Sequence, residues 1–410
     1  MLPIRIGTIT FDWYPDDARV HRLVEAALDA GYAVDVICLK QPGEKRYQVA
    51  GGVQIYRMPM NRGFGHLLPM TVLAWCWFLL LAGVTITRLH LKHAYDVIHV
   101  HNIPDFLIFS TLIPKLLGAK VILDIQDVCP ELMGVKANGR MRRMVIALAR
   151  WQEHVSTSFA DHVVTVGQPF AELLQRRGVL SKKLSIIINS ADPKTFPASY
   201  RDRSEGKTSN RNNPLILMYH GTVAERNGLD IAIRALAMAR QIAPDIRLDI
   251  LGRGEHIPVL KQLAADLHVN DSVVFVGYRA LEDVVKFVAH GDVGIIPYRN
   301  NEFMKLILPT KAYEFAWIHR PMIASNTPAI RSLFRPESLM LCDPSRPEEF
   351  AKAIITLYQH PEKRAKMVQD AYEDYKPHEW EPMAHHYQQL LATLACKCQR
   401  LHTKHWRHIR

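Results

Sequence analysis

A lysine and a glutamate three positions apart are the residues in this sequence most readily assigned a chemical task. Lys311 and Glu314 follow Pro309 in the segment LPTKAYEF. If a helix begins near Thr310, both side chains share a face close to its N-terminus. The ammonium group and the free backbone N–H groups there suit a diphosphate, and a carboxylate suits the paired hydroxyls of a ribose. The alternative is that the acid only complements the helix dipole.

A glycine-containing loop supplies a second candidate for phosphate binding. In YHGTVAERNG an apolar run ends at Tyr219, and Gly221, Thr222 and Gly228 bracket a loop that carries Arg226. Glycine permits close backbone approach, the following helix offers free N–H groups, and arginine makes paired contacts to phosphate. The segment lacks the GxGxxG spacing of a dinucleotide site and the ending of a P-loop. An ordinary loop with a solvated arginine is the alternative.

Polar residues in the first half of the chain also follow apolar runs. His101 ends DVIHVH, and Asp127 and Glu131 follow VILDI. Ligands of open parallel sheets bind beyond the carboxyl ends of strands, so these residues are candidates for acid–base chemistry or for binding hydroxyls. Asp16 and Arg19 open the first predicted helix, where Arg19 suits an anionic acceptor. The alternative for each is a role in bonding its own loop or in a solvated helix face.

Several classes of site are missing from the sequence. No Asp-x-Asp pair occurs that would hold Mg²⁺ or Mn²⁺ on a diphosphate. We therefore expect no obligatory metal and no cofactor, with Arg226, Lys311 and helix N-termini neutralising the phosphates. A serine-hydrolase elbow, a zinc-binding spacing and the patterns of nucleic-acid readers are also missing. The net charge of +11 then favours a phosphate-bearing substrate or an acidic membrane surface, with no nucleic acid as partner.

The elements that must position these residues form two series of predicted strands. Short apolar runs alternate with helical patterns, which is typical of parallel sheets covered on both faces. Because the pattern restarts after residue 212, the sequence predicts an α/β protein with two doubly wound domains. The expected strands are Arg5–Thr10, Val34–Leu39, Val53–Met58, Val97–His101, Val121–Ile125, His162–Val166 and Leu184–Ile188, then Leu215–Tyr219, Arg247–Leu251, Val273–Val276, Val293–Pro297, Met322–Ser325 and Leu339–Leu341.

Three segments lie outside this alternation. Residues 197–213 are polar, without an apolar period, and form the predicted linker. Residues 396–410 form a basic tail that we expect to be solvated. The run Leu67–Ile86 contains no charge and is long enough to span a bilayer. Spanning would separate strands of one predicted sheet, so a helix in the membrane interface fits better, with a core helix as the other alternative.

The compartment follows from the N-terminus and the cysteines. The segment MLPIRIGTITF reads as a first strand and lacks the features of a signal peptide. The six cysteines are scattered apart from the terminal pair, which favours a reducing compartment. Together with the uncharged helix, this predicts a cytoplasmic protein that is peripheral on the inner face of the cell membrane.

Taken in order, the motifs resemble those of glycosyltransferase family 4, the retaining nucleotide-sugar transferases of the GT-B fold. The resemblance rests on DARVHRLVEAALDAGYAVDV, DIQDVCPE, IIINSADPKTF, YHGTVAERNG, LGRGE, FVGY and LPTKAYEFAWIHRPMIAS. It implies an acceptor-binding domain over residues 1–196, completed by a C-terminal helix at 378–395, and a nucleotide-sugar-binding domain over residues 214–377 that faces it across a cleft. The first two motifs resemble bacterial members that build surface polysaccharides and glycolipids.

The resemblance also implies roles for individual residues. Arg226 and Lys311 would bind the diphosphate, Glu314 the ribose, and Asp127 would lie near the transferred sugar or the acceptor. The catalytic candidates are Asp127, Arg226, Lys311 and Glu314. The donor-binding candidates are Gly221, Thr222, Arg226, Thr310, Lys311 and Glu314. The acceptor-binding candidates are Asp16, Arg19, His101 and Glu131.

Three positions depart from the pattern of the family. Many members carry a second glutamate eight positions before the one matched by Glu314, but Leu306 stands there, and Glu302 is the nearest substitute. Asn227 replaces a frequent lysine, and Gln126 replaces a frequent histidine. A histidine-assisted mechanism is therefore not assumed.

The function that we expect is transfer of a hexose or amino sugar from a nucleoside diphosphate to an acceptor hydroxyl, with retention of configuration. The acceptor is expected to be lipid-linked or a saccharide, at the membrane surface. Two alternatives remain open at this point. One is a nucleotide-sugar epimerase or a phosphorylase of the same fold, and the other is a catalytically degenerate transferase subunit.

Overall fold

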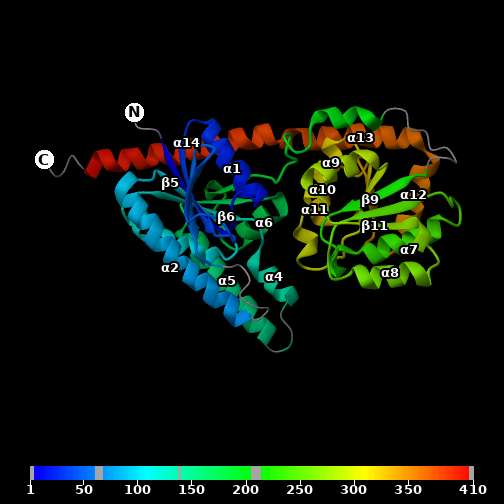
Figure 1. Ribbon diagram of the computed structural model, residues 1–410, viewed down its shortest axis with the longest axis horizontal. Helices are drawn as coiled ribbons and strands as arrows, with labels where there is room; N and C mark the ends of the chain where they lie inside the picture. The colour runs from blue at the N-terminus through cyan, green and yellow to red at the C-terminus, as the bar shows by residue number, and fades with distance from the viewer. Residues whose placement is uncertain (1–3, 61–67, 137–138, 140, 205–213, 406–410) are drawn as a thin grey trace. The chain divides into compact units, whose positions relative to one another are not determined.

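The computed structural model describes residues 4–60, 68–136, 139, 141–204 and 214–405. The chain divides into two compact units, each built around one sheet (Figure 1). Unit 1 comprises residues 1–188 and 381–410, and unit 2 comprises residues 189–380. The predicted α/β class with two doubly wound sheets is confirmed.

Unit 1 contains an eight-stranded sheet in the order β3-β4-β2-β1-β5-β6-β7-β8. All neighbouring strands are parallel except β3, which pairs antiparallel with β4. The apolar strands are buried because helices cover the sheet. The strands are β1 (Arg5–Trp13), β2 (Ala33–Leu39), β3 (Tyr47–Ala50), β4 (Val53–Met58), β5 (Val97–His101), β6 (Lys120–Ile125), β7 (His162–Thr165) and β8 (Leu184–Ile186).

The helices of unit 1 connect these strands, and a last helix returns from the C-terminal end of the chain. The first helix begins where the side chain of Asp17 caps the backbone N–H groups of Arg19 and Val20. The returning helix α14 is fixed to this unit by a hydrogen bond from Gln388 Nε2 to the carbonyl of Ala26. The helices are α1 (Ala18–Asp29), α2 (Leu68–His93), η1 (Asp105–Thr111), α3 (Leu112–Leu116), α4 (Cys129–Lys136), α5 (Met141–Phe159), α6 (Gln168–Arg176), η2 (Ser181–Lys183) and α14 (Trp380–His405).

Unit 2 contains a six-stranded parallel sheet in the order β11-β10-β9-β12-β13-β14. Its strands are β9 (Ile216–His220), β10 (Arg247–Leu251), β11 (Val273–Gly277), β12 (Val293–Ile296), β13 (Met322–Ser325) and β14 (Met340–Cys342). Its helices are η3 (Ala198–Ser204), η4 (Glu225–Asn227), α7 (Leu229–Ala239), α8 (Ile257–Asp266), η5 (Asn270–Ser272), α9 (Leu281–His290), η6 (Met304–Leu306), α10 (Thr310–Trp317), α11 (Pro328–Arg331), α12 (Pro347–Gln359), α13 (Pro361–Tyr375) and η7 (Lys376–His378).

The segments between the sheets differ from the sequence prediction. The predicted linker begins with η3, where the Arg201 guanidinium stacks 3.7 Å from the Trp317 ring centroid and donates to its carbonyl. Polar composition hid this contact, because a stacked arginine needs a tertiary partner. The rest of the linker, residues 205–213, lies outside the described residues, as do Leu67 and residues 406–410. The predicted tail continues α14 as far as His405.

Candidate active site

Glycine-built loops lie at the carboxyl ends of the central strands of unit 2. After β9, Gly221 adopts a φ of +118°, and after β10, Gly252 adopts a φ of +148°. A Cβ atom on Gly252 would lie 1.8 Å from the carbonyl oxygen of Gly221, and one on Gly254 would lie 1.9 Å from that of Val223. Only glycine permits these approaches. The two loops are held together by a hydrogen bond from Val223 N to the Arg253 carbonyl, 2.9 Å.

Lys311 lies beneath the first of these loops as a buried cation. Helix α10 begins at Thr310, as predicted, after Pro309, which provides no side-chain cap. The Lys311 Nζ atom donates to the hydroxyl of Tyr298 at 2.9 Å and lies 4.3 Å from the ring centroid of Tyr219. It would lie 3.6 Å from a Cβ atom on Gly221. Among the residues that the structure describes, no carboxylate lies within ion-pair distance of this ammonium group.

The protonation state of Lys311 follows from these neighbours. Burial alone would lower its pKa, but the phenol groups of Tyr219 and Tyr298 outweigh burial and raise the pKa above its ordinary value. The side chain therefore stays charged at neutral pH. A buried cation that has hydroxyl and aromatic neighbours, and no carboxylate among the described residues, is stabilised by an added negative charge, because burying a charge without an opposite charge is costly. The arrangement is suited to an anion at the glycine loop.

A histidine that the sequence reading missed lies beside Glu314. His220 ends β9, and its Nε2 atom lies 3.1 Å from Oε2 of Glu314. Burial, with a smaller effect of the Lys311 charge, lowers the His220 pKa to about 3. The imidazole is thus neutral and contacts one carboxylate oxygen without supplying charge. The only sequence signal for this residue was its place directly before Gly221, at the end of an apolar run.

The remaining donor-binding candidates lie at the same edge of the sheet, because β9 and β12 are neighbours. Thr222, Thr310 and the side chain of Arg226 are exposed there. Arg226 belongs to η4, and its carbonyl accepts a hydrogen bond from Arg299 N at 3.2 Å. Glu302, the substitute for the missing family glutamate, is exposed and pairs with Lys305 at 2.6 Å. The structure thus brings the predicted donor-binding residues together within unit 2.

In unit 1, the predicted acceptor residue Arg19 is part of a buried network. Its Nε and Nη2 atoms contact the two carboxylate oxygens of Asp124 at 2.8 and 2.9 Å, and Nη1 donates to the Ile187 carbonyl. His101 Nδ1 lies 3.2 Å from Asp124, and His99 Nδ1 lies 2.8 Å from the Tyr387 hydroxyl of α14. We predicted that Arg19 contacts the acceptor, but its guanidinium is buried and is bonded to Asp124 and Ile187 of the same unit.

The chemistry of this network is that of a permanent ion pair. Burial alone would raise the Asp124 pKa, but the Arg19 charge and His101 hold it well below its ordinary value. The donor atoms of His99, His101 and Asp124 lie within 4.8 Å of one another, as metal ligands would. Arg19 already supplies the cation at Asp124, so the donor set does not favour a metal ion.

The other unit 1 candidates occupy different surroundings. Glu131 opens α4 and pairs with Arg177, which also binds both oxygens of Glu153. Its carboxylate is therefore engaged within the unit, which differs from the predicted acceptor contact. Asp127 is half-buried, and its carbonyl accepts a hydrogen bond from Asn102 Nδ2 at 2.7 Å. Asp16 is exposed and accepts a hydrogen bond from Gln41.

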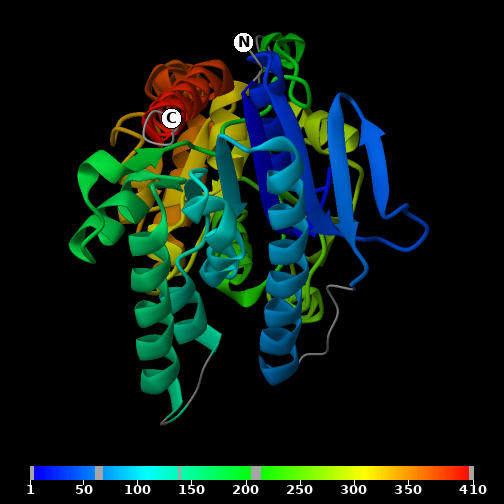
Figure 2. The same cartoon turned by 90° about the vertical axis from the view of Figure 1, so that its left-hand side faces the viewer.

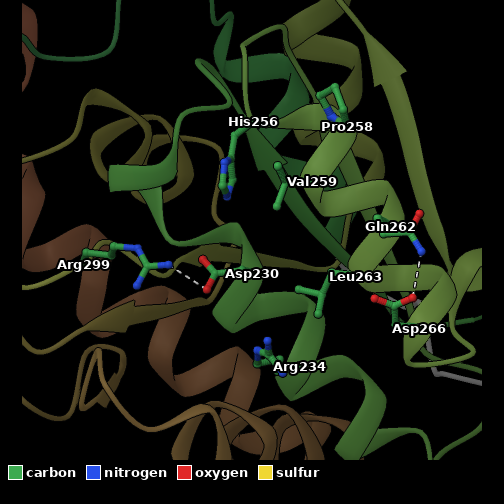
Figure 3. Close-up of a pocket in the computed structure, with 9 residues that line it drawn as sticks. All are labelled: Asp230, Arg234, His256, Pro258, Val259, Gln262, Leu263, Asp266 and Arg299. Carbon is green, nitrogen blue, oxygen red and sulfur yellow. Dashed lines mark hydrogen bonds and ion pairs between the residues drawn. The ribbon is translucent and has the colours of Figure 1, made fainter.

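A separate groove of about 590 Å³ runs between α7 and α8 (Figure 3). None of the predicted site residues lines it. Arg299 at its rim bonds Asp230 at 2.8 Å and the Glu225 carbonyl at 3.0 Å, which connects the groove to the Arg226 loop. The groove is lined by Asp230, Arg234, His256, Pro258, Val259, Gln262, Leu263, Asp266 and Arg299.

Two doubly wound sheets, the second with a glycine-built edge above a buried lysine, agree with the GT-B fold expected from the motifs. Family models match both halves of the chain: "Glycosyl transferase 4-like domain" over residues 17–189 and "Glycosyl transferases group 1" over residues 201–374. The chain belongs to this glycosyltransferase family, which confirms the resemblance read from the motifs.

Relatives span the chain at low identity. An uncharacterised glycosyltransferase of Methanocaldococcus jannaschii is 21% identical over 93% of this chain and 96% of its own length. The alpha-D-kanosaminyltransferase of Streptomyces kanamyceticus is 22% identical over 64% of this chain and 67% of its own. The D-inositol 3-phosphate glycosyltransferase of Pseudarthrobacter chlorophenolicus is 25% identical over 48% of this chain, which spans only 47% of that relative.

Solved structures share the fold. Sucrose-phosphate synthase of Thermosynechococcus elongatus superposes with a TM-score of 0.73 and 20% identity, over 95% of this chain and 99% of that one. The Anabaena protein HepE, solved in complex with UDP, gives a TM-score of 0.68 and 16% identity, over 95% of this chain and 100% of its own. These likenesses confirm the GT-B fold.

Proposed function

We propose that the protein transfers a hexose or an amino sugar from a nucleoside diphosphate to an acceptor hydroxyl, with retention of configuration and without an obligatory metal. The observation that carries this proposal is Lys311, a buried cation that contacts Tyr298 and Tyr219 below a glycine loop, with no carboxylate partner among the described residues. A diphosphate would supply the missing negative charge. The donor class also agrees with HepE, a structural neighbour whose complex contains UDP.

Each residue at this edge then has a task in the transfer. In the reaction, the bond from the anomeric carbon to the β-phosphate oxygen breaks, a bond to the acceptor oxygen forms, and the acceptor hydroxyl gives up its proton, so that the nucleoside diphosphate leaves with the bonding electron pair. Negative charge grows on the departing phosphate, where Lys311, Arg226 and the N-terminus of α10 would stabilise it. Glu314, in contact with neutral His220, would accept hydrogen bonds from the ribose hydroxyls. The role of Asp127 near the transferred sugar or the acceptor stays a prediction.

A lipid-linked acceptor at the inner face of the membrane is the second part of the proposal. Helix α2 is long and apolar enough to cross a bilayer by length and composition, and only 22% of its most apolar window is buried. The strands on either side of it, β4 and β5, belong to one sheet through β2 and β1. A spanning helix would divide that sheet. We therefore propose that α2 lies in the membrane interface.

Thermal-shift screening against UDP-, GDP-, ADP- and dTDP-sugars tests the donor class. A donor that binds the folded state raises the melting temperature by mass action. We expect one nucleotide to raise it and Glu314→Ala to reduce that shift. Product analysis with and without acceptor then tests transfer. Conversion of the donor without acceptor would indicate an epimerase, and the absence of any nucleotide-induced shift would contradict the proposal.

A further inference from the structure

Helix α2 presents an apolar stripe to solvent as well as to the sheet. A surface helix of a soluble protein ordinarily carries polar residues on its outer face. Here the outer stripe is 50–70% exposed at every position. The buried stripe consists of Ala74, Phe78, Ala82 and Ile86, and the exposed stripe consists of Leu73, Trp77, Leu80 and Val84.

Helix α5 carries a second exposed apolar stripe. Met144, Leu148 and Trp151 follow one another at helical spacing and are 61%, 62% and 64% exposed. On the opposite side of the same helix, Ala149 and Glu153 are buried. Over these two turns the helix therefore exposes large apolar side chains among exposed arginines.

The two helices belong to one face of unit 1. Both pack against η1: the Trp75 ring of α2 lies 6.3 Å from Phe106, and Phe159 of α5 lies 5.2 Å from Phe109. Figure 2 shows α2 and α5 running side by side in front of the sheet. The short helix α3 follows η1 directly and adds exposed leucine and isoleucine side chains. These are Leu112, Ile113 and Leu116, and Leu117 directly after the helix is exposed as well.

The charges on this face have one sign. Helices α2 and α5 contain a single acidic residue, Glu153, which is buried and bonded to Arg177. Their exposed basic side chains are Arg88, Lys92, Arg142, Arg143 and Arg150. A self-complementary contact with a second copy would bring these like charges together. Anionic lipid headgroups would neutralise them, while the tryptophans suit the interface between headgroups and acyl chains.

We propose that the exposed stripes of α2 and α5 together form a lipid-docking surface for an anionic bilayer. This inference rests on the proposed lipid-linked acceptor and extends it, because α5 has no run of uncharged residues that would mark it as a membrane segment. Two exposed apolar stripes on separate helices would fix the orientation of unit 1 on the bilayer. A single interfacial helix would leave the unit free to rotate about the helix axis.

Vesicle sedimentation with the full-length protein tests the surface. The probe is vesicles of phosphatidylglycerol and phosphatidylcholine, compared with vesicles of phosphatidylcholine alone. Leu148→Glu with Trp151→Glu should weaken binding to the anionic vesicles at least tenfold, because two apolar side chains leave the interface and two negative charges enter it. The matched control is Ile242→Glu, an equally exposed apolar residue of unit 2, which should bind as the wild type does.

A second pair of variants separates charge from burial. Arg143→Gln with Arg150→Gln should reduce the preference for anionic over neutral vesicles and retain most of the binding to neutral ones, because three of the five exposed basic side chains remain. All variants should keep the nucleotide-induced thermal shift of the wild type, which shows that they are folded and distinguishes failure of this surface from failure of the donor site. Unchanged vesicle binding by the α5 variant would overturn the inference. A dimer in solution that the α5 variant dissociates, without vesicle binding, would also overturn it.

Discussion

Replacing Lys311 with methionine should separate function from stability. Methionine keeps the length and the apolar stem but removes the charge and the 2.9 Å hydrogen bond to the Tyr298 hydroxyl. Losing a hydrogen bond to a charged group costs roughly 1.5–3 kcal/mol. Lys311 has no carboxylate partner in the described part of the chain, so removing its buried charge recovers a similar amount of desolvation free energy. The free energy of unfolding should therefore change by less than about 1 kcal/mol.

The effect of the same substitution on turnover should be large. Removing one preorganised donor to a developing anion typically costs about 3–4 kcal/mol of transition-state stabilisation, or roughly 10²–10³-fold in rate. Urea unfolding measures the first quantity and steady-state transfer measures the second. Lys305→Met is the matched control, because Lys305 is more exposed and pairs with Glu302. A Lys311→Met variant that loses several kcal/mol of stability but keeps its turnover would refute the reasoning, since Lys311 would then be a structural cation.

Four further outcomes follow from the site. Gly252→Ala should cost about 3 kcal/mol in urea unfolding, because its Cβ would lie 1.8 Å from the carbonyl of Gly221; Gly277→Ala, with a positive φ but open space, should cost less. His220→Ala should raise the donor KM roughly tenfold and change kcat little, whereas the amide N–H of His220→Gln should keep part of the donor affinity. Equal increases in KM in both variants would contradict the positioning role of His220. The His220 pKa falls from 6.5 to about 3 on folding, so the unfolded chain binds the proton first as the pH drops. Between pH 6.5 and 4.5, the free energy of unfolding of the wild type should therefore decrease by roughly 2–3 kcal/mol more than that of His220→Gln. Turnover should survive EDTA, and a loss restored only by Mg²⁺ or Mn²⁺ would contradict the metal-independent mechanism.

The strands and the start of α10 could be read from local patterns. Continuous apolar runs mark buried parallel strands, and Pro309 before Thr310 marks a helix start, so the predicted strand positions agree with the structure to within about three residues. The edge strand β3 was missed because its side chains are exposed and give no apolar run. Helix α5 was not singled out because its apolar residues alternate with arginines in the sequence.

Contacts between distant residues could not be predicted from the sequence. Arg19 and Asp124 are 105 positions apart, and no local pattern indicates that the helix face of Arg19 meets the β6 strand. The same holds for Glu131, whose partner Arg177 lies directly after α6. For Glu314, one part of the site could be predicted and the other could not. Its helical spacing to Lys311 is visible in the sequence, but its contact with His220 arises only when β9 packs beside α10.

The most direct test of the account is whether Glu314 reads the ribose. Isothermal titration would compare the nucleoside diphosphate identified by thermal shift with its 2′-deoxy analogue, on the wild type and on Glu314→Ala. We predict that removing the 2′-hydroxyl weakens binding to the wild type about tenfold and has little further effect on the variant, because the two partners form one hydrogen-bonded contact. An equal loss in both proteins would show that Glu314 does not contact the ribose and would contradict the site described for unit 2.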